Sequence, residues 1–365
     1  MDTRNDHKSI VIVVGGTHHN TLSIIRSLGM AGYKVDLIHT GEAGGFVTKS
    51  RYVNSILEIG DASLLVSVLK NKYASTQRKS IVITCTDSVA HELDTHYDEL
   101  KDRFFFFNAG ENNRVTHFMD KHKQVELASQ VGMVVPFSII YNGEIDTIQY
   151  PCLIKPLKSI SGGKQIRICN AETELITALG SFQSSNSLLI QQYIQKEYEI
   201  VVVGLSLANQ CLIPGYVRKH REYDGGTTYS TVYPISKLDN SIVDQCKKFI
   251  NAVNYKGLFG FEFIYCKGQF FFIEANLRND ATTYALTKAG TNLPAIYVES
   301  ASNALYDNID MHISEIGSMV EFNDFKHRKE NNVSLAKWLK QYFSARCKYY
   351  FDWKDIMPFI YAPFK

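Results

Sequence analysis

The chain has 365 residues and a formal net charge of +2, and 45% of its residues are hydrophobic while 21% are charged. This composition is ordinary for a folded globular protein and excludes a fibrous or largely disordered chain, and the length suggests two or three domains. The near balance of 39 basic and 37 acidic residues gives no reason to expect a nucleic-acid partner.

The seven cysteines are scattered and form no CxxC pair. This pattern argues against a disulfide framework or a zinc site and favours a reducing compartment. The polar N-terminus lacks the apolar core of a secretory signal, and no apolar run approaches the roughly 18 residues needed to span a bilayer. We therefore expect a cytoplasmic protein without a transmembrane segment.

The first third of the chain alternates predicted strands and helices. Apolar runs predict buried strands at residues 10–14, 35–38, 81–84 and 104–107, and leucines at helical spacing predict helices capped by Asn20 and Asp61. Strands that alternate with helices in this way indicate a parallel α/β layer. We expect a Rossmann-like domain over residues 1–115.

The pattern changes after residue 115. A helix over residues 120–131 is followed by strands at 152–155, 166–168, 188–192, 199–207, 259–265 and 270–274, with two helices between them. This mixture indicates α+β organisation. We expect subdomains at 116–195 and 196–310, with helix over much of 282–305.

Residues 311–365 form a C-terminal extension in which aromatic and basic side chains are mixed. We expect a helix that packs on the body of the protein. Contact with a membrane surface is the alternative interpretation.

Lys155 ends a buried strand, where an ammonium group is costly without a partner. A phosphate group is one suitable partner. The loop that follows contains Ser161, Gly162 and Gly163, and its backbone N–H groups could close over phosphate oxygens. A plain hairpin with a solvated lysine is the alternative.

A second candidate site lies at the end of the apolar strand 188–192. The residues there are Gln191, Gln192, Tyr193 and Ile194. Backbone groups of such a segment can read the edge of an adenine base, and a carboxylate at its exit can accept ribose hydroxyls. Glu197 and Glu199 are both candidates for the second role, and an ordinary amphipathic strand and turn is the alternative.

Glu262 and Glu274 lie in Phe-rich strands joined by a turn at Gly268. Antiparallel pairing would bring the two carboxylates together, and such a buried pair is seldom tolerated without a cation. Mg²⁺ would resolve the repulsion. Asn276 and Arg278 follow at two-residue steps, which places them on the same side of an extended chain.

These features occur in the order found in the ATP-grasp family, which the chain resembles from its first strand to about residue 305. Lys121 resembles the basic residue that contacts phosphate at the start of that family's middle domain, and Lys155 resembles its phosphate-gripping strand lysine. The loop with Ser161, Gly162 and Gly163 resembles the family's mobile lid.

The nucleotide-binding and metal-binding motifs match in part. Residues 191–194 resemble the adenine hinge, although Gln191 stands where Glu is common. Glu197 resembles the ribose-binding glutamate, and Glu199 competes for that role because Lys196 replaces the usual Gly. The family's metal ligands are matched by Glu262, Glu274 and Asn276. Arg278 matches the arginine of its ExNxR motif, with Leu277 where Pro is common.

The resemblance implies an ATP-grasp fold with an N-terminal Rossmann-like domain. It also implies a ligase that uses ATP and Mg²⁺, with Mn²⁺ as an alternative metal, to join a small-molecule carboxylate to an amine through an acyl-phosphate. ADP and phosphate would be released. Lys155, Arg218 and Arg278 would act in catalysis, and a homodimer is a common assembly in this family.

The residues expected to contact the substrates lie in three segments. Residues 217–228 resemble a basic stretch of D-aspartate ligase and other amino-acid ligases, so we expect Arg218 to contact phosphate or the acyl intermediate and Arg221 a substrate carboxylate. A solvated loop is the alternative. Asp87 could bind an amine, and His18 lies in a strand–helix turn that would help to hold the substrate.

The substrate is expected to be an amino acid or a carboxylate linked to the cell envelope or a polysaccharide. A carbamoyl-phosphate-synthase-like or carboxylase activity is one alternative, and a non-catalytic nucleotide-binding module is another. A nicotinamide oxidoreductase is disfavoured because the GxGxxG pattern is missing after the first strand.

Overall fold

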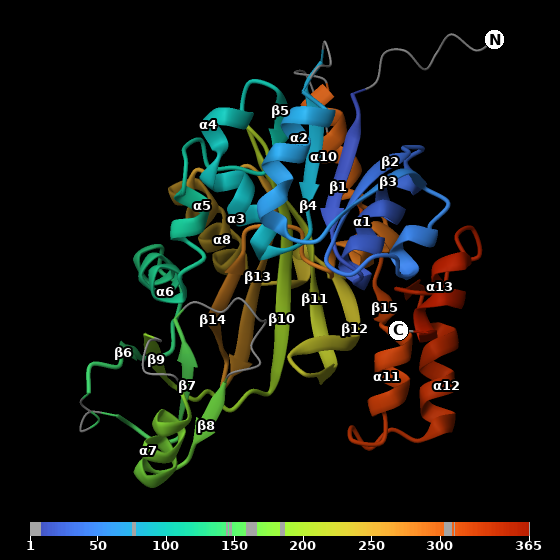
Figure 1. The fold of residues 1–365 in the computed structure, drawn as a ribbon. Helices are drawn as coiled ribbons and strands as arrows, with labels where there is room; N and C mark the ends of the chain where they lie inside the picture. Colours follow the sequence, from blue (N-terminus) through green and yellow to red (C-terminus); the bar gives the residue numbers. More distant parts are fainter. Residues whose placement is uncertain are drawn as a thin grey trace, which may run out of the picture.

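The computed structural model describes residues 9–74, 78–143, 145, 148–157, 166–182, 187–302, 309 and 311–364. Three β-sheets organise this part of the chain (Figure 1). The N-terminal sheet is parallel and has the strand order β3-β2-β1-β4-β5. Its strands are β1 (Val11–Gly15), β2 (Val35–Thr40), β3 (Val53–Ile59), β4 (Ser80–Thr84) and β5 (Phe104–Phe106).

Helices cover both faces of this sheet. The helices are α1 (His19–Met30), α2 (Leu65–Lys72), α3 (Asp87–Thr95), α4 (Tyr97–Leu100) and α5 (Arg114–His117). Alternate residues of a strand point to opposite faces, so Val11 and Val13 join the core that contains α1, whereas Ile12 and Val14 pack with α2 and α3. The predicted parallel α/β layer is confirmed.

Two helices begin differently from the sequence-based predictions. Asp61 caps a short 3₁₀ turn (Ala62–Leu64) that precedes α2. Helix α1 is capped by His18, whose Nδ1 accepts a hydrogen bond from the backbone N of Asn20. The Asn20 side chain donates instead to the backbone oxygens of Cys85 and Asn279, so the prediction of Asn20 as the cap was wrong.

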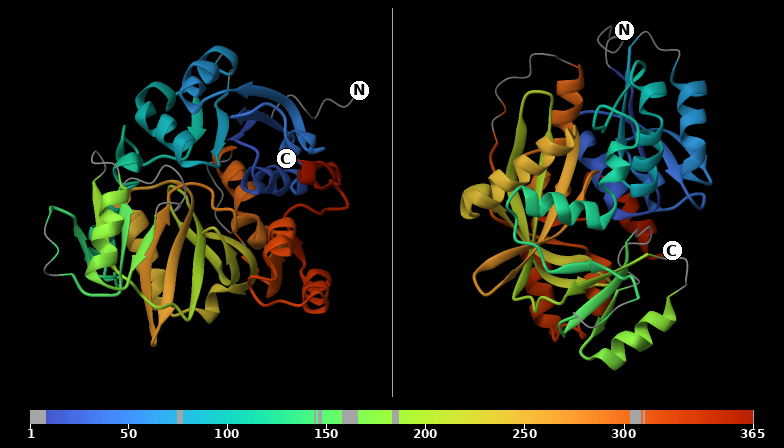
Figure 2. Two further views of the ribbon diagram at one scale, coloured as in Figure 1. Left: turned by 60° about the horizontal axis from the view of Figure 1, so that its bottom comes forward. Right: turned by 90° about the vertical axis from the view of Figure 1, so that its left-hand side faces the viewer.

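The second sheet is antiparallel and forms a smaller lobe (Figure 2). Its strand order is β6-β9-β7-β8, with β6 (Ser138–Ile140), β7 (Cys152–Pro156), β8 (Arg167–Cys169) and β9 (Leu188–Gln192). Helix α6 (Lys121–Gln130) precedes this sheet, and α7 (Glu172–Ser181) packs against it. Ser161, Gly162 and Gly163 fall outside the described residues.

The third sheet is the largest and has the order β14-β13-β10-β11-β12-β15-β16. Its strands are β10 (Tyr198–Ser206), β11 (Cys211–Tyr223), β12 (Gly226–Pro234), β13 (Gly257–Cys266), β14 (Gln269–Asn276), β15 (Ile316–Met319) and β16 (Cys347–Lys348). The predicted hairpin turn is confirmed, with Gly268 at φ 83°. The predicted alternative of a loop at 217–228 is replaced by the hairpin of β11 and β12.

Six helices of the described residues accompany this sheet: α8 (Asn240–Val253), α9 (Thr283–Ala289), α10 (Leu293–Ser302), α11 (Glu321–His327), α12 (Leu335–Ser344) and α13 (Met357–Tyr361). Phe249 of α8 packs against Phe261 and Phe272. Helices α9 and α10 contact both the sheet and α1 of the N-terminal domain. A buried Arg26–Asp355 ion pair of 2.9 Å ties the C-terminal extension to the same domain. No helix in the described ranges is long and apolar enough to cross a bilayer.

Candidate active site

Glu262 and Glu274 lie directly opposite each other on β13 and β14, where a bulge between Glu262 and Phe263 shifts the register. The expected antiparallel pairing does bring the two carboxylates together. Residues paired across an antiparallel sheet project from the same face. Burial raises the pKa of Glu262 to about 7, with Glu274 adding to the rise and Lys219 opposing it. Burial also acts to raise the pKa of Glu274, but nearby cations outweigh it and the pKa is lowered. A cation shared by the two carboxylates would relieve their repulsion.

One of those cations lies on α6, which packs against β14, and another lies on the smaller lobe. Lys121 begins α6, and its Nζ lies 3.3 Å from Oε2 of Glu274. Lys155 lies near the end of β7, is 5% exposed and donates to Oε1 of Gln191 at 3.0 Å. Burial lowers the pKa of Lys155 to about 8, with Lys121 contributing and Glu274 opposing. A buried ammonium group next to a second cation is suited to a polyanionic ligand such as a phosphate chain.

Lys219 joins the cluster, although the sequence analysis assigned it no role. Its Nζ donates to Glu262 at 2.8 Å and to Glu199 at 2.9 Å. Burial acts to lower the pKa of Lys219, but Glu262, Glu199 and Glu222 outweigh it and hold the pKa well above its usual value. The available signal was the spacing of Val217 and Lys219, which share a face once the segment is read as a strand.

Arg278 connects the large sheet to the N-terminal domain. It forms a fork with Asp87, with Nε to Oδ1 at 2.6 Å and Nη2 to Oδ2 at 3.2 Å. Nη2 also donates to Oδ1 of Asn276 at 3.1 Å. Burial, followed by the charge of Arg278, lowers the pKa of His18 to about 4. The structure thus brings Asp87, His18 and Asn276 to Arg278, at the border of the carboxylate pair.

The two predicted substrate arginines of β11 lie elsewhere. The guanidinium of Arg221 is held by both oxygens of Asp324 at 2.8 and 2.7 Å, so we do not carry Arg221 into the proposed site. Arg218 neighbours Lys219 and therefore points to the opposite face of the sheet. Its guanidinium stacks 3.8 Å from the ring centre of Tyr198, away from Glu262.

The predicted adenine hinge, residues 191–194, begins at Gln191, whose side chain accepts the hydrogen bond from Lys155. The Gln191 side chain links Lys155 to Ser138, because its Nε2 donates to Ser138 Oγ at 2.9 Å. Gln192 and Tyr193 donate backbone N–H groups to Phe137 and Pro151, and Ile194 is buried.

The two ribose candidates differ in their surroundings. Glu197 accepts from the backbone N of Lys267 in the β13–β14 turn at 2.8 Å. Glu199 is bonded to Lys219 and lies on the side of the sheet that carries Glu262. The geometry therefore connects Glu199, rather than Glu197, to the carboxylate pair.

Gln124 is a further residue that the sequence analysis did not single out. This buried α6 side chain makes both backbone hydrogen bonds of Ala275, with Nε2 donating to the oxygen and Oε1 accepting from the nitrogen, each at 2.9 Å. Ala275 lies between Glu274 and Asn276. Gln124 thus fixes α6, and with it Lys121, against the strand that carries the candidate metal ligands.

Replacing Gln124 with Ala should lower the free energy of unfolding by about 2–4 kcal/mol, because it leaves two buried backbone groups without partners. Urea denaturation measures this loss. Gln130→Ala is the matched control, since Gln130 is an exposed residue of the same helix, and it should change stability by less than about 0.5 kcal/mol. Equal stability of both variants would contradict the structural role of Gln124.

The donor set suits Mg²⁺ held jointly with phosphate. No group of three or more His, Cys, Asp or Glu side chains able to hold a metal occurs in the described part of the chain. Two carboxylates and the amide of Asn276 leave several positions of an octahedral ion for phosphate oxygens and water, which is the usual manner of Mg²⁺ binding in nucleotide sites.

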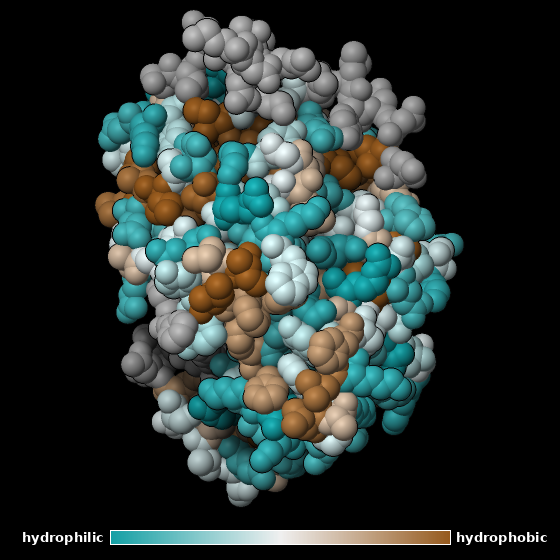
Figure 3. Space-filling model, turned by 90° about the vertical axis from the view of Figure 1, so that its right-hand side faces the viewer, coloured by the Kyte–Doolittle hydropathy of each residue, from teal (hydrophilic) through white to brown (hydrophobic). Residues whose placement is uncertain are grey.

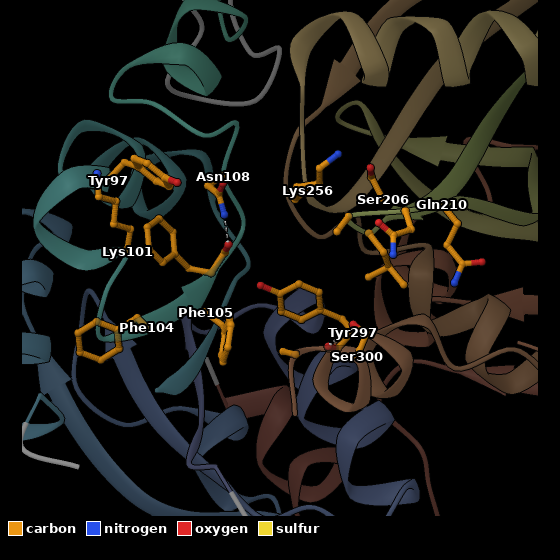
Figure 4. A pocket seen from close by; sticks show the side chains of 15 residues that line it. Tyr97, Lys101, Phe104, Phe105, Asn108, Ser206, Gln210, Lys256, Tyr297 and Ser300 are labelled. Atoms are coloured by element: carbon orange, nitrogen blue, oxygen red, sulfur yellow. Dashed lines mark hydrogen bonds between the residues drawn. The ribbon is translucent and has the colours of Figure 1, made fainter. Parts of the chain in front are cut away.

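A separate pocket of about 380 Å³ lies at the end of β10 and the start of β13 (Figure 4). Ser206, which ends β10, and Lys256, which precedes β13, line it together with Tyr297 of α10. Glu199 and Glu262 lie about six residues away along the same strands, roughly 20 Å at the rise of an extended chain. The pocket is therefore distinct from the carboxylate cluster.

Comparison with known proteins assigns the central part of the chain to a known domain family. Residues 133–292 match the family model described as ATP-grasp domain. These residues form an ATP-grasp domain. The match includes Lys155, the hinge, Glu262, Glu274 and Arg278, and the predicted fold is confirmed.

Solved structures share this fold. An L-amino acid ligase from Bacillus licheniformis superimposes with a TM-score of 0.67 at 14% identity, covering 86% of this chain and 80% of its own. N5-carboxyaminoimidazole synthetase from Staphylococcus aureus, complexed with ADP, gives a TM-score of 0.69 at 14% identity, covering 89% and 86%.

A curated relative is the carbamoyl phosphate synthase large chain of Lachnoclostridium phytofermentans, which is 29% identical over 160 residues. That match covers 41% of this chain and 15% of the relative. Across five curated relatives the matched share of their length runs from 13% to 50%.

Proposed function

We propose that the protein is an Mg²⁺-ATP-dependent ligase that joins a carboxylate to an amine and releases ADP and phosphate. The observation that carries the proposal is the pairing of Glu262 with Glu274, surrounded by Lys121, Lys155 and Arg278. An ATP-grasp domain and solved structures that include an amino-acid ligase and an ADP-bound synthetase support it.

In this proposal the nucleotide lies between the smaller lobe and the large sheet. Lys121 and Lys155 neutralise phosphate oxygens, and residues 191–194 border the adenine. Glu199 is the preferred partner of the ribose hydroxyls because it shares Lys219 with Glu262. The metal would be held by Glu262, Glu274 and Asn276.

Bound Mg²⁺-ATP would supply the phosphoryl group and the charge neutralisation for its transfer to a substrate carboxylate. The chain's own groups would orient the reactants. Arg278 places a permanent cation where an acyl-phosphate and its tetrahedral successor would carry negative charge. Asp87 sets the direction of that guanidinium, and its exposed carboxylate is also placed to receive a substrate amine.

ADP release from Mg²⁺-ATP, measured with hydroxylamine as a surrogate amine across a panel of amino acids and other carboxylates, tests this function. A carboxylate that produces both ADP and its hydroxamate is the expected result. A protein that binds ATP but releases no ADP with any carboxylate in the panel would contradict the proposed reaction with free small-molecule carboxylates.

A second candidate function is a carbamoyl-phosphate-synthase-like or carboxylase activity, in which ATP transfers its phosphoryl group to bicarbonate. The match to carbamoyl phosphate synthase and the likeness to N5-carboxyaminoimidazole synthetase favour it. The same assay separates the two functions. ADP release that depends on bicarbonate and yields no hydroxamate with any organic acid would select the second.

A further inference from the structure

Helix α12 presents an uncovered apolar stripe. Leu335, Leu339 and Phe343 follow one another at four-residue steps and therefore lie along one side of the helix. They are 50%, 40% and 76% exposed. Trp338 lies beside Leu335 and anchors the helix, since it is buried and its Nε1 donates to Asp324 at 2.9 Å. The described residues thus leave the stripe facing solvent.

The other sides of α12 are positively charged. Lys340 is exposed beside the stripe, Lys337 is exposed on the side away from it, and the helix contains no acidic residue. Lys326, Lys329 and Arg346 are exposed in the adjoining segments, where Glu330 is the exposed acid and pairs with His327. Figure 3 views the side of the molecule on which the C-terminal helices lie, and hydrophobic side chains are exposed there among hydrophilic ones.

We propose that α12 is an interfacial helix that docks the protein on an anionic lipid surface. A short helix with Leu and Phe on one side and lysines on its polar sides lies in the plane of a membrane interface, where acidic headgroups attract its positive charge. A second copy of the chain fits the stripe less well, because docking by the same surface would bring the lysines of both copies together.

Hydrogen bonds and an ion pair join α12 to the large sheet. Asp324, which anchors Trp338, also holds Arg221 of β11, and Lys219 lies on the same strand. Docking would therefore be transmitted to the strand that carries Lys219. The inference rests on the surface of α12 and does not depend on the proposed reaction.

Sedimentation with vesicles tests the proposal. The full chain should bind vesicles of phosphatidylcholine and phosphatidylglycerol in a two-to-one ratio, and should bind pure phosphatidylcholine much more weakly. Leu339→Ser with Phe343→Ser should lower the partition coefficient at least about ten-fold by removing the inserted side chains. Lys337→Glu with Lys340→Glu should do the same by reversing the charge.

The matched control is Leu64→Ser with Lys72→Glu, which changes a 51% exposed leucine and an exposed lysine of the N-terminal domain. It should bind vesicles like the unaltered protein. Failure of the unaltered protein to bind, equal binding to pure phosphatidylcholine, or unchanged binding of either α12 variant would overturn the proposal. A dimer that sedimentation velocity detects and that the Leu339/Phe343 variant loses would assign the stripe to a second copy instead.

Discussion

Glu274→Gln should lower Mg²⁺-dependent ADP formation at least about 1,000-fold while the protein stays folded. Glu274 faces Glu262 across the hairpin and contacts Lys121. Removing its charge takes a ligand from the metal that neutralises the transferring phosphoryl group. A loss of several kcal/mol of such stabilisation corresponds to a rate decrease of about this size.

The matched control is Glu58→Gln, an exposed glutamate of β3 in the N-terminal sheet. It should retain full turnover. Circular dichroism and thermal unfolding should show both variants folded, since Gln preserves the volume of the side chain. Unchanged turnover in Glu274→Gln would remove the metal assignment, whatever the activity of the control.

Lys155→Ala should weaken ATP binding roughly 10- to 100-fold, because hydrogen bonds to charged groups are worth about 1.5–3 kcal/mol each. Isothermal titration calorimetry measures the dissociation constant. Lys72→Ala is the control, since Lys72 is an exposed lysine of α2. An unaltered ATP affinity in Lys155→Ala would make this lysine structural.

The same lysine predicts a pH dependence. Burial lowers its pKa to about 8 in the free protein, and only the protonated form attracts phosphate. ATP affinity should therefore be level below that pKa and fall as the pH rises through it, by up to about ten-fold per pH unit for one linked proton. Lys155→Arg, which stays charged, should flatten the profile between pH 7 and pH 9. An identical fall in that variant would assign the titration to another group.

The carboxylate pair could be placed from the sequence because its geometry is local. The two turn residues between the strands bring Glu262 close to residues 273 and 274, and a bulge between Glu262 and Phe263 makes Glu274 its partner. The parallel layer could also be predicted from the sequence, since β1 and β4 contain apolar runs and three of the first four residues of β2 are apolar. Strand β3 could not be predicted in this way, because it is an edge strand in which exposed and half-buried residues alternate without an apolar run.

Contacts between distant residues could not be predicted. Arg221 pairs with Asp324, 103 residues away, and Gln124 binds Ala275, 151 residues away. No periodicity along the chain encodes such partners. The alternation of β11 was also hidden, because the cation Lys219 occupies an inward position where a hydrophobic residue is the usual signal. The domain boundaries near residues 115, 195 and 310 and the roles of the site residues stay predictions.

The most direct test of the proposed acyl-phosphate reaction follows an oxygen atom from the substrate carboxylate to the released phosphate. The substrate carboxylate that promotes ADP release is labelled with ¹⁸O and turned over with the amine and Mg²⁺-ATP, and the released phosphate is analysed by mass spectrometry. One carboxylate oxygen is expected in each phosphate, because the acyl-phosphate bond is made through that oxygen and broken on its carbonyl side. Phosphate without label would contradict it.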